Sequence, residues 1–237
     1  MHAPVILHIE TSTNVCSVAL SEGADCLFSI SNDEGLNHAA LLSTFIEKAL
    51  NVLKDLSKKL EAVAVSGGPG SYTGLRIGVS TAKGLCYGLN IPLIEISTLA
   101  TLCTAAFKVE IVDENALFCA MIDARRMEVY AAIYDAKKNI RKDISADIID
   151  ASSYADLQAQ HRVYFFGNGA EKCKQTLKHP NAYFIDHLTP LAVNMIASAM
   201  EQFNAGKFVD IAYYEPYYLK EFQPTTPKNQ YANYAEI

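Results

Sequence analysis

The chain has 237 residues, half of them apolar and about a fifth charged, a composition typical of a globular protein with one large core or two modest ones. The formal net charge of −6 excludes the strongly basic field of a protein that binds nucleic acid unaided. No apolar run reaches the roughly 18 to 20 residues of a membrane span, and the N-terminus lacks a cationic leader. The six cysteines form no Cys-x-x-Cys pair, so we expect a cytoplasmic protein with reduced thiols and no membrane contact.

The first half of the chain starts with a short apolar run at 4–10 that ends in Glu10, which predicts a buried strand. Two more strands joined by tight turns follow it. Apolar residues then repeat at three- and four-residue spacing, the pattern of a helix. The predicted elements after the first strand are strands at 15–20 and 24–30, a helix at 38–53, a strand at 62–66, a helix at 73–89, a strand at 91–96 and a helix at 98–107.

The second half begins again in the same way, with an apolar run at 117–123 that ends in Asp123. The elements predicted after it are strands at 128–134 and 140–149, a helix at 152–160, a strand at 163–166, a helix at 170–178 and a last helix from 189 to 204. This internal duplication predicts two α/β lobes, at 1–110 and 111–222, joined by a polar connector near 108–115 and followed by a mobile tail at 223–237. By fold analogy, duplicated lobes of this order suggest the actin-like ATPase architecture.

A glycine-rich stretch at 65–88 holds seven of the twelve glycines. It matches neither the Walker loop nor the dinucleotide fingerprint, because no glycine starts the first pattern and Gly74 comes one residue late for the second. A strand, a loop and a helix start could still attract an anion. On spacing alone, a tight turn between strand and helix is the better interpretation.

The helix after this loop contains two glycine pairs, each one turn apart, Gly74 with Gly78 and Gly84 with Gly88. Each interior glycine costs a helix about 0.8–1.0 kcal/mol relative to alanine. Small residues on one face allow another backbone to come close. The sequence leaves two explanations open, close packing against the parent sheet and close contact with a helix of another chain.

Several fragments together resemble the TsaB (YeaZ) family, the bacterial partner subunit in the synthesis of threonylcarbamoyladenosine in tRNA. These fragments are Ile-Leu-His-Ile-Glu-Thr-Ser at 6–12, Ser-Gly-Gly-Pro-Gly-Ser-Tyr-Thr-Gly-Leu-Arg-Ile-Gly at 66–78, Ile-Ser-Thr-Leu at 96–99, Ile-Asp-Ala-Arg at 122–125 with Glu-Val-Tyr at 128–130, and Glu-Pro-Tyr-Tyr-Leu-Lys at 215–220. The resemblance runs from the first strand to about residue 220. It implies a duplicated two-lobe actin-like fold of the ASKHA, ribonuclease H-like type.

The resemblance also implies a role without catalysis of its own. The catalytic paralogue of the family, TsaD, carries a His-x-x-x-His metal motif where this chain has Thr98 and Leu102, and neither side chain offers an imidazole to a metal. Bulky residues at 123–127 replace the glycine-rich phosphate segment of the paralogue. We therefore expect no catalytic residue, no metal and no cofactor in this chain alone, with ATP and metal held by partner subunits.

The partners that the resemblance implies are TsaD, in a heterodimer, and the P-loop ATPase TsaE, with tRNA contacted only through the complex. In this family the helices at 38–53 and 73–89 pack against the equivalent helices of TsaD, and without TsaD a homodimer through the same helices is expected. The expected interface residues are His38, Leu41, Leu42, Phe45, Gly74, Arg76, Gly78 and Ala82. A bulky residue at Gly78 should then weaken the heterodimer and leave the fold intact.

The two acids that end the first strand of each half form the remaining candidate site. The duplication places Glu10, followed by Thr11 and Ser12, opposite Asp123 across the cleft between the lobes. The pair could hold metal ions or a metal–nucleotide complex; alternatively, the acids are inherited from the common fold and bond to nearby backbone amides, which the missing phosphate segment favours. Two rival functions remain open, an independent actin-like ATPase or sugar kinase and a metal-dependent peptidase or nuclease.

Overall fold

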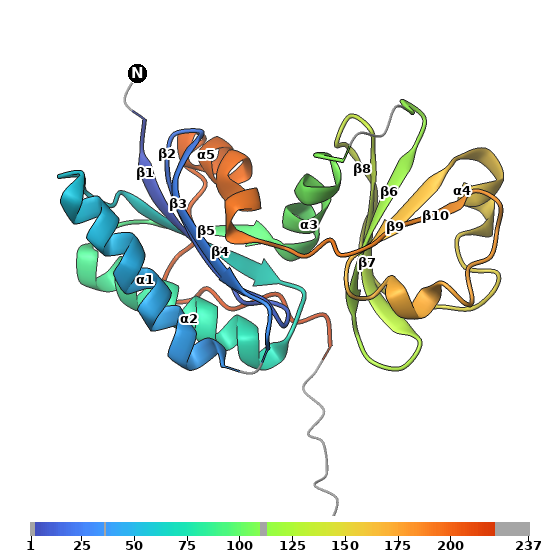
Figure 1. Ribbon diagram of the computed structural model, residues 1–237, viewed down its shortest axis with the longest axis horizontal. Coiled ribbons are helices and arrows are strands. Elements are labelled where there is room, and N and C mark those ends of the chain that lie inside the picture. Colours follow the sequence, from blue (N-terminus) through green and yellow to red (C-terminus); the bar gives the residue numbers. More distant parts are fainter. Residues whose placement is uncertain (1–2, 36, 110–112, 221–237) are drawn as a thin grey trace, which may run out of the picture.

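The structure, a computed structural model, describes residues 3–35, 37–109 and 113–220. Two α/β lobes lie side by side, with helix α3 (Thr98–Ala106) between their sheets (Figure 1). The expected mobile tail at 223–237 and residues 110–112 of the expected connector lie outside the described residues. Within the described part of the chain, no helix is both long and apolar enough to cross a membrane.

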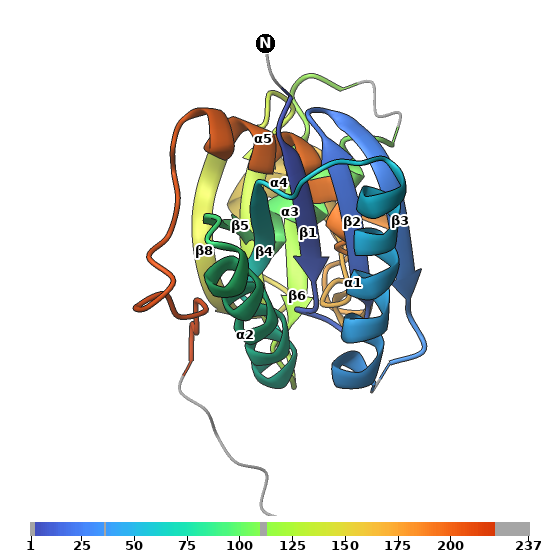
Figure 2. The same ribbon diagram turned by 90° about the vertical axis from the view of Figure 1, so that its left-hand side faces the viewer.

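The first lobe contains a five-stranded mixed sheet in the order β3-β2-β1-β4-β5. Its strands are β1 (Val5–Glu10), β2 (Cys16–Glu22), β3 (Asp25–Asn32), β4 (Ala62–Gly68) and β5 (Leu93–Ser97). The β1 strand pairs antiparallel with β2 and parallel with β4. Helices α1 (His38–Asp55) and α2 (Tyr72–Leu89) cover the outer face of this sheet and lie side by side (Figure 2).

The second lobe repeats this topology, with the sheet order β10-β9-β6-β7-β8. Its strands are β6 (Leu117–Asp123), β7 (Glu128–Asp135), β8 (Ile140–Ile148), β9 (Val163–Phe166) and β10 (Ala182–Ile185). As in the first lobe, the first strand pairs antiparallel with the second and parallel with the fourth. The predicted duplicated two-lobe actin-like α/β fold is confirmed.

The strand β1 is buried on both faces, which explains its continuous apolar sequence. Side chains alternate between the two faces of a strand. Val5, Leu7 and Ile9 pack in the core under α1 and α2. Ile6 packs on the opposite face with helix α5 (Ile196–Asn204), and the alternation places His8 and Glu10 on that same face.

Helix α3 joins the two lobes through a shared apolar core. Its residues Leu99, Leu102 and Cys103 pack with Phe118 of β6 and Phe166 of β9. These side chains are almost completely buried. Helix α3, which follows β5 of the first sheet, therefore covers the inner face of the second sheet.

The structure differs from the sequence-based prediction after residue 150. The helix expected at 170–178 is only a 3₁₀ turn, η1 (Glu171–Cys173), and β10 was not expected. The helix α4 (Ala155–Gln160) begins three residues later than expected, and the last helix is a 3₁₀ turn, η2 (Ala192–Met195), followed by α5. The strand β10 completes the sheet by parallel pairing with β9, a contact between separate segments that local sequence patterns do not reveal.

After η2 the chain returns to the first lobe. Helix α5 packs on the inner face of the first sheet, and Val209 then forms an antiparallel bridge with Leu93 at the free edge of β5. Further along, the amide of Tyr217 donates to the carbonyl oxygen of Gly67 at 2.7 Å. We call residues 207–220 the return segment. Residues within the range 111–222 therefore pack against both sheets.

Candidate partner surface and interlobe acids

The helices α1 and α2 form the outer face of the first lobe, and the expected interface residues on α1 point mostly inward. Leu42 and Phe45 are buried in the core beneath the helix, and Leu41 is half-buried against it. His38, at the start of α1, has its Nε2 2.8 Å from the carbonyl oxygen of Thr13.

The first glycine pair of α2 packs against its own sheet. A Cβ atom at Gly74 would clash with the carbonyl oxygen of Thr11, and one at Gly78 would clash with the Thr11 hydroxyl. That hydroxyl donates to the carbonyl oxygen of Gly74 at 2.8 Å. The expectation that a bulky residue at Gly78 leaves the fold intact is therefore wrong, because Thr11 at the end of β1 occupies the space.

The second glycine pair is free of such contacts. Apart from its chain neighbours and the nearby backbone of α2 itself, a Cβ atom at Gly84 or at Gly88 would meet no atom of the described chain within 4 Å. Beside them, Tyr87 is 81% exposed and Leu89 is 51% exposed. Ala82, by contrast, is fully buried beneath the helix. The outer face of α2 thus combines open glycines with large exposed apolar side chains.

Arg76 connects α2 with the return segment. Its guanidinium lies 4.1 Å from the centre of the Tyr72 ring and donates to the Tyr72 hydroxyl. The Tyr218 ring lies 4.6 Å from the Tyr72 ring, and a hydrogen bond with Tyr218 raises the pKa of Arg76 above its ordinary value. Arg76 is exposed, so this cluster of rings and cation lies at the border of the outer face.

Glu10 is completely buried at the end of β1. One carboxylate oxygen accepts a hydrogen bond from the Ser12 amide at 2.6 Å, and the other has no partner within the described chain. Burial raises the pKa of Glu10 from 4.5 to about 7, and the Ser12 hydrogen bond opposes this only in part. The Ser12 hydroxyl is also buried without a partner among the described residues.

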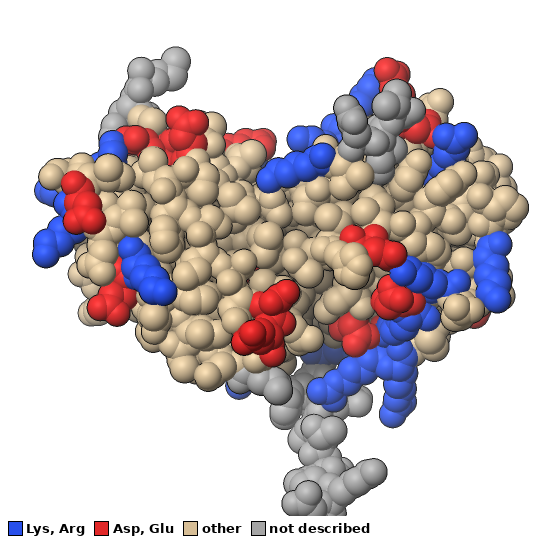
Figure 3. All heavy atoms as spheres, in the orientation of Figure 1, with Lys and Arg blue, Asp and Glu red and all other residues tan. Residues whose placement is uncertain are grey.

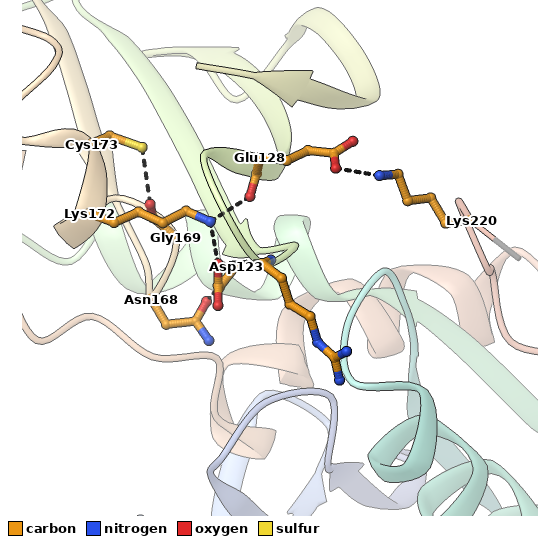
Figure 4. Close-up of polar contacts among 8 residues, drawn as sticks. Asp123, Glu128, Asn168, Gly169, Lys172, Cys173 and Lys220 are labelled. Carbon is orange, nitrogen blue, oxygen red and sulfur yellow. Dashed lines mark hydrogen bonds and ion pairs between the residues drawn. The ribbon is translucent and has the colours of Figure 1, made fainter. Parts of the chain in front are cut away.

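Asp123 lies in a network of contacts within the second lobe (Figure 4). Its carboxylate pairs with Lys172 and accepts from the Arg125 amide at 3.1 Å, while its own amide donates to Asn168. Lys172 also donates to the carbonyl oxygen of Glu128. Glu10 and Asp123 therefore each accept a hydrogen bond from the backbone amide two residues further along the chain. This is the arrangement expected if both acids are inherited from the common fold.

The structure also brings together sequence motifs that lie far apart along the chain. Lys220 of the return segment pairs with Glu128 at the start of β7 (Figure 4). The Tyr217 contact with Gly67 connects the same segment to the glycine-rich stretch. The sequence did not identify Lys172 as the partner of Asp123, because Lys172 lies 49 residues after Asp123 in a run predicted to be a helix.

Among the residues that the structure describes, neither the charged side chains nor the potential metal ligands form a further site. On the face seen in Figure 3, Lys and Arg side chains gather on the lower part of the second lobe, with acidic side chains beside them. Arg125 and Arg126 adopt left-handed backbone angles, φ 68° and 49°, in the turn between β6 and β7, where glycine or asparagine is usual. Across the residues described here, no three His, Cys, Asp or Glu side chains gather as a metal site.

The comparisons with known proteins agree with this architecture. A family model described as TsaD, tRNA N6-adenosine threonylcarbamoyltransferase, matches residues 34–222. The Escherichia coli (strain K12) protein named tRNA threonylcarbamoyladenosine biosynthesis protein TsaB is 30% identical over 223 residues, 91% of this chain and 94% of the relative. The Bacillus subtilis (strain 168) protein of the same name is 30% identical over 176 residues, 73% and 75% of the two chains.

A solved structure of YeaZ from Pseudomonas aeruginosa is 26% identical and covers 91% of this chain and all of its own, with a TM-score of 0.75. The duplicated sheets and the strand-end acids define the class, a two-lobe actin-like α/β protein. This chain belongs to the TsaB (YeaZ) family, within the wider group that the TsaD family model describes.

Proposed function

We propose that this chain is a non-catalytic subunit that binds and stabilises TsaD during threonylcarbamoylation of the adenosine beside the anticodon in tRNA. Family membership supports a role in this pathway, since the relatives are named for threonylcarbamoyladenosine biosynthesis. The observation that carries the partner role is the outer face of α2, where Gly84 and Gly88 lie open beside exposed Tyr87 and Leu89. Glycines inside a helix lower its stability, and no contact within the described chain requires them at these two positions. Their small size would allow the close approach of a partner helix.

The residues at the positions of the paralogue's metal motif support the non-catalytic half of the proposal. The Thr98 hydroxyl is buried and lies 2.7 Å from the Ser66 hydroxyl. Leu102 is fully buried in the core shared by α3 and the second sheet. Both positions therefore serve packing, and their side chains provide no metal ligand of the usual kind.

The assembly that follows has three further parts. TsaE joins the complex as its P-loop ATPase, ATP and metal are bound by the partner subunits, and tRNA is contacted through the complex. In the absence of TsaD, the same outer face of α1 and α2 forms a homodimer.

The test is association of the purified chain with TsaD from the same organism, measured by analytical ultracentrifugation. We expect a one-to-one complex that replaces the homodimer. Gly84→Leu should weaken it at least about tenfold, because a side chain there prevents close helix contact. Ala159→Leu, on the exposed α4 of the second lobe, is the matched control and should leave the affinity unchanged. Equal affinities of the two variants would contradict this interface.

An independent ATPase or peptidase is the alternative. It requires the isolated chain to bind ATP at micromolar affinity or to retain a stoichiometric metal ion after purification. Calorimetry with ATP and metal analysis of the pure chain would detect either. A positive result without TsaD association would replace the partner role by a catalytic one centred on Glu10 and Asp123.

A further inference from the structure

A cavity of about 670 Å³ lies at the C-terminal end of β5, between the first sheet and β8. The pocket is open to solvent, and residues 214–218 of the return segment form part of its lining. We call it the tyrosine cavity; its lining includes Glu95, Ser97, Ile144, Tyr214, Tyr217 and Tyr218. Its volume falls within the range of about 300–1,000 Å³ typical of small-molecule sites. The partner face of α1 and α2 does not include it.

Two carboxylates line this cavity, the exposed Glu215 and the more buried Glu95, and Glu95 has no cation of its own within the described chain. Its side chain is largely shielded from solvent, and this burial alone raises its pKa. Within the described chain, no lysine, arginine or histidine lies within ion-pair distance of it. A largely shielded carboxylate without a cation is costly, and proteins normally pair such a group.

Tyr214 adds a second unpartnered polar atom at the same place. Its hydroxyl is buried without a hydrogen-bond partner in the described structure, although its backbone is held by Asp210 and Lys83. The hydroxyl and the Glu95 carboxylate both lie over Gly67, where a Cβ atom would clash with each of them. Glycine at 67 thus makes room for the two polar groups to converge.

The lining favours one class of ligand. A carboxylate attracts a cation, and the faces of tyrosine rings attract organic cations through their quadrupole. The Tyr214 hydroxyl oxygen can accept from an N–H group. Among the described residues, no three His, Cys, Asp or Glu side chains gather here as the ligands of a metal ion. We propose that the tyrosine cavity binds an alkylammonium or guanidinium group, with Glu95 as its counter-ion and Tyr214 as a hydrogen-bond acceptor.

The first test uses n-butylguanidinium and its neutral isostere n-butylurea, each titrated into the full chain by calorimetry. We expect n-butylguanidinium to bind and n-butylurea not to bind. Glu95→Gln should weaken binding of the cation at least about tenfold, because the charge is lost while the shape is kept. Glu201→Gln, an exposed acid on α5, should bind as the unchanged chain does. If both probes bind equally well, or if n-butylguanidinium binds and Glu95→Gln does not weaken it, the proposal is overturned.

Two further measurements address folding and the source of the cation. Tyr217→Leu removes a half-exposed ring from the lining without opening the core, and should also weaken the cation while leaving the melting temperature unchanged. If the cation is a side chain of TsaD, free n-butylguanidinium does not bind and Glu95→Gln weakens TsaD association at least about tenfold, whereas Glu201→Gln does not. If Glu95→Gln weakens neither n-butylguanidinium binding nor TsaD association, the proposal is overturned. A chain that does not bind TsaD refutes the partner role, and the n-butylguanidinium titration then decides alone.

Discussion

Replacing Glu10 by glutamine should change how the free energy of unfolding depends on pH. Burial raises the pKa of Glu10 from 4.5 to about 7, so the folded protein holds a proton that the unfolded chain releases. At 1.36 kcal/mol for each pH unit, this interval corresponds to about 3 kcal/mol. The stabilisation is complete below pH 4.5 and is lost as the pH rises through about 7. Glutamine keeps the shape of the side chain and removes this dependence.

His8, two residues earlier on the same face of β1, acts in the opposite direction. It is completely buried, its Nε2 lies 2.8 Å from the Ser21 hydroxyl, and burial lowers its pKa from 6.5 to about 3. Its contribution is therefore complete above pH 6.5 and is lost as the pH falls towards 3. Between pH 4.5 and 6.5 the two effects oppose each other with equal slopes. The unchanged protein should show little contribution from this pair there.

The assay is urea denaturation followed by circular dichroism at intervals between pH 4.5 and 7.5 and at constant ionic strength. For Glu10→Gln, the free energy of unfolding relative to the unchanged protein should fall by about 1.4 kcal/mol for each pH unit as the pH falls from about 7 to 4.5. For His8→Gln, this difference should instead rise by about 1.4 kcal/mol for each pH unit as the pH falls from 6.5 to 4.5. A constant difference between the Glu10→Gln and unchanged proteins across this range would refute the reasoning, since Glu10 would then have the same pKa in both states.

Two further predictions concern helix α2. Gly84→Ala should raise the free energy of unfolding by about 0.8–1.0 kcal/mol, because alanine favours the helix and meets no atom there, whereas Gly78→Ala should lower it through its clash with Thr11; effects of the same sign in urea denaturation would contradict this difference. Ser71 caps the helix by accepting from the Gly74 amide at 3.3 Å, so Ser71→Ala should lower the free energy of unfolding by about 1 kcal/mol and Ser71→Gly by less. Indistinguishable values for the two Ser71 variants would argue against the cap.

Local patterns predicted most of the first lobe and the duplication. The apolar run of β1 ending in Glu10 and that of β6 ending in Asp123 were visible because strands buried on both faces give continuous apolar sequences. The strand β10 could not be predicted in this way. It has only four residues, and its side chains are half-buried or exposed. It is a strand because it pairs with β9, a separate segment of the chain, and not because of a local sequence pattern.

The candidate site was less predictable, because contacts between distant residues define it. The two glycine pairs of α2 look alike in sequence, and only the position of Thr11 beneath the helix separates them. Glu95 and Tyr214 lie on β5 and on the return segment, so no spacing rule connects them. Helix periodicity predicts that Leu42 and Phe45 are buried, as the structure shows. It does not show whether the exposed side chains of α1 contact a partner.

The return of the chain to the first lobe determines the order in which the protein can be completed during its synthesis. The strand β5 emerges from the ribosome long before Val209, which pairs with its edge, and before α5, which covers the inner face of its sheet. Until then the nascent chain exposes an unpaired sheet edge and an uncovered apolar surface, the features that favour aggregation. A chain that stops after the second sheet would keep both exposed permanently. Shortened forms of this protein should therefore depend on chaperones even where every strand is present.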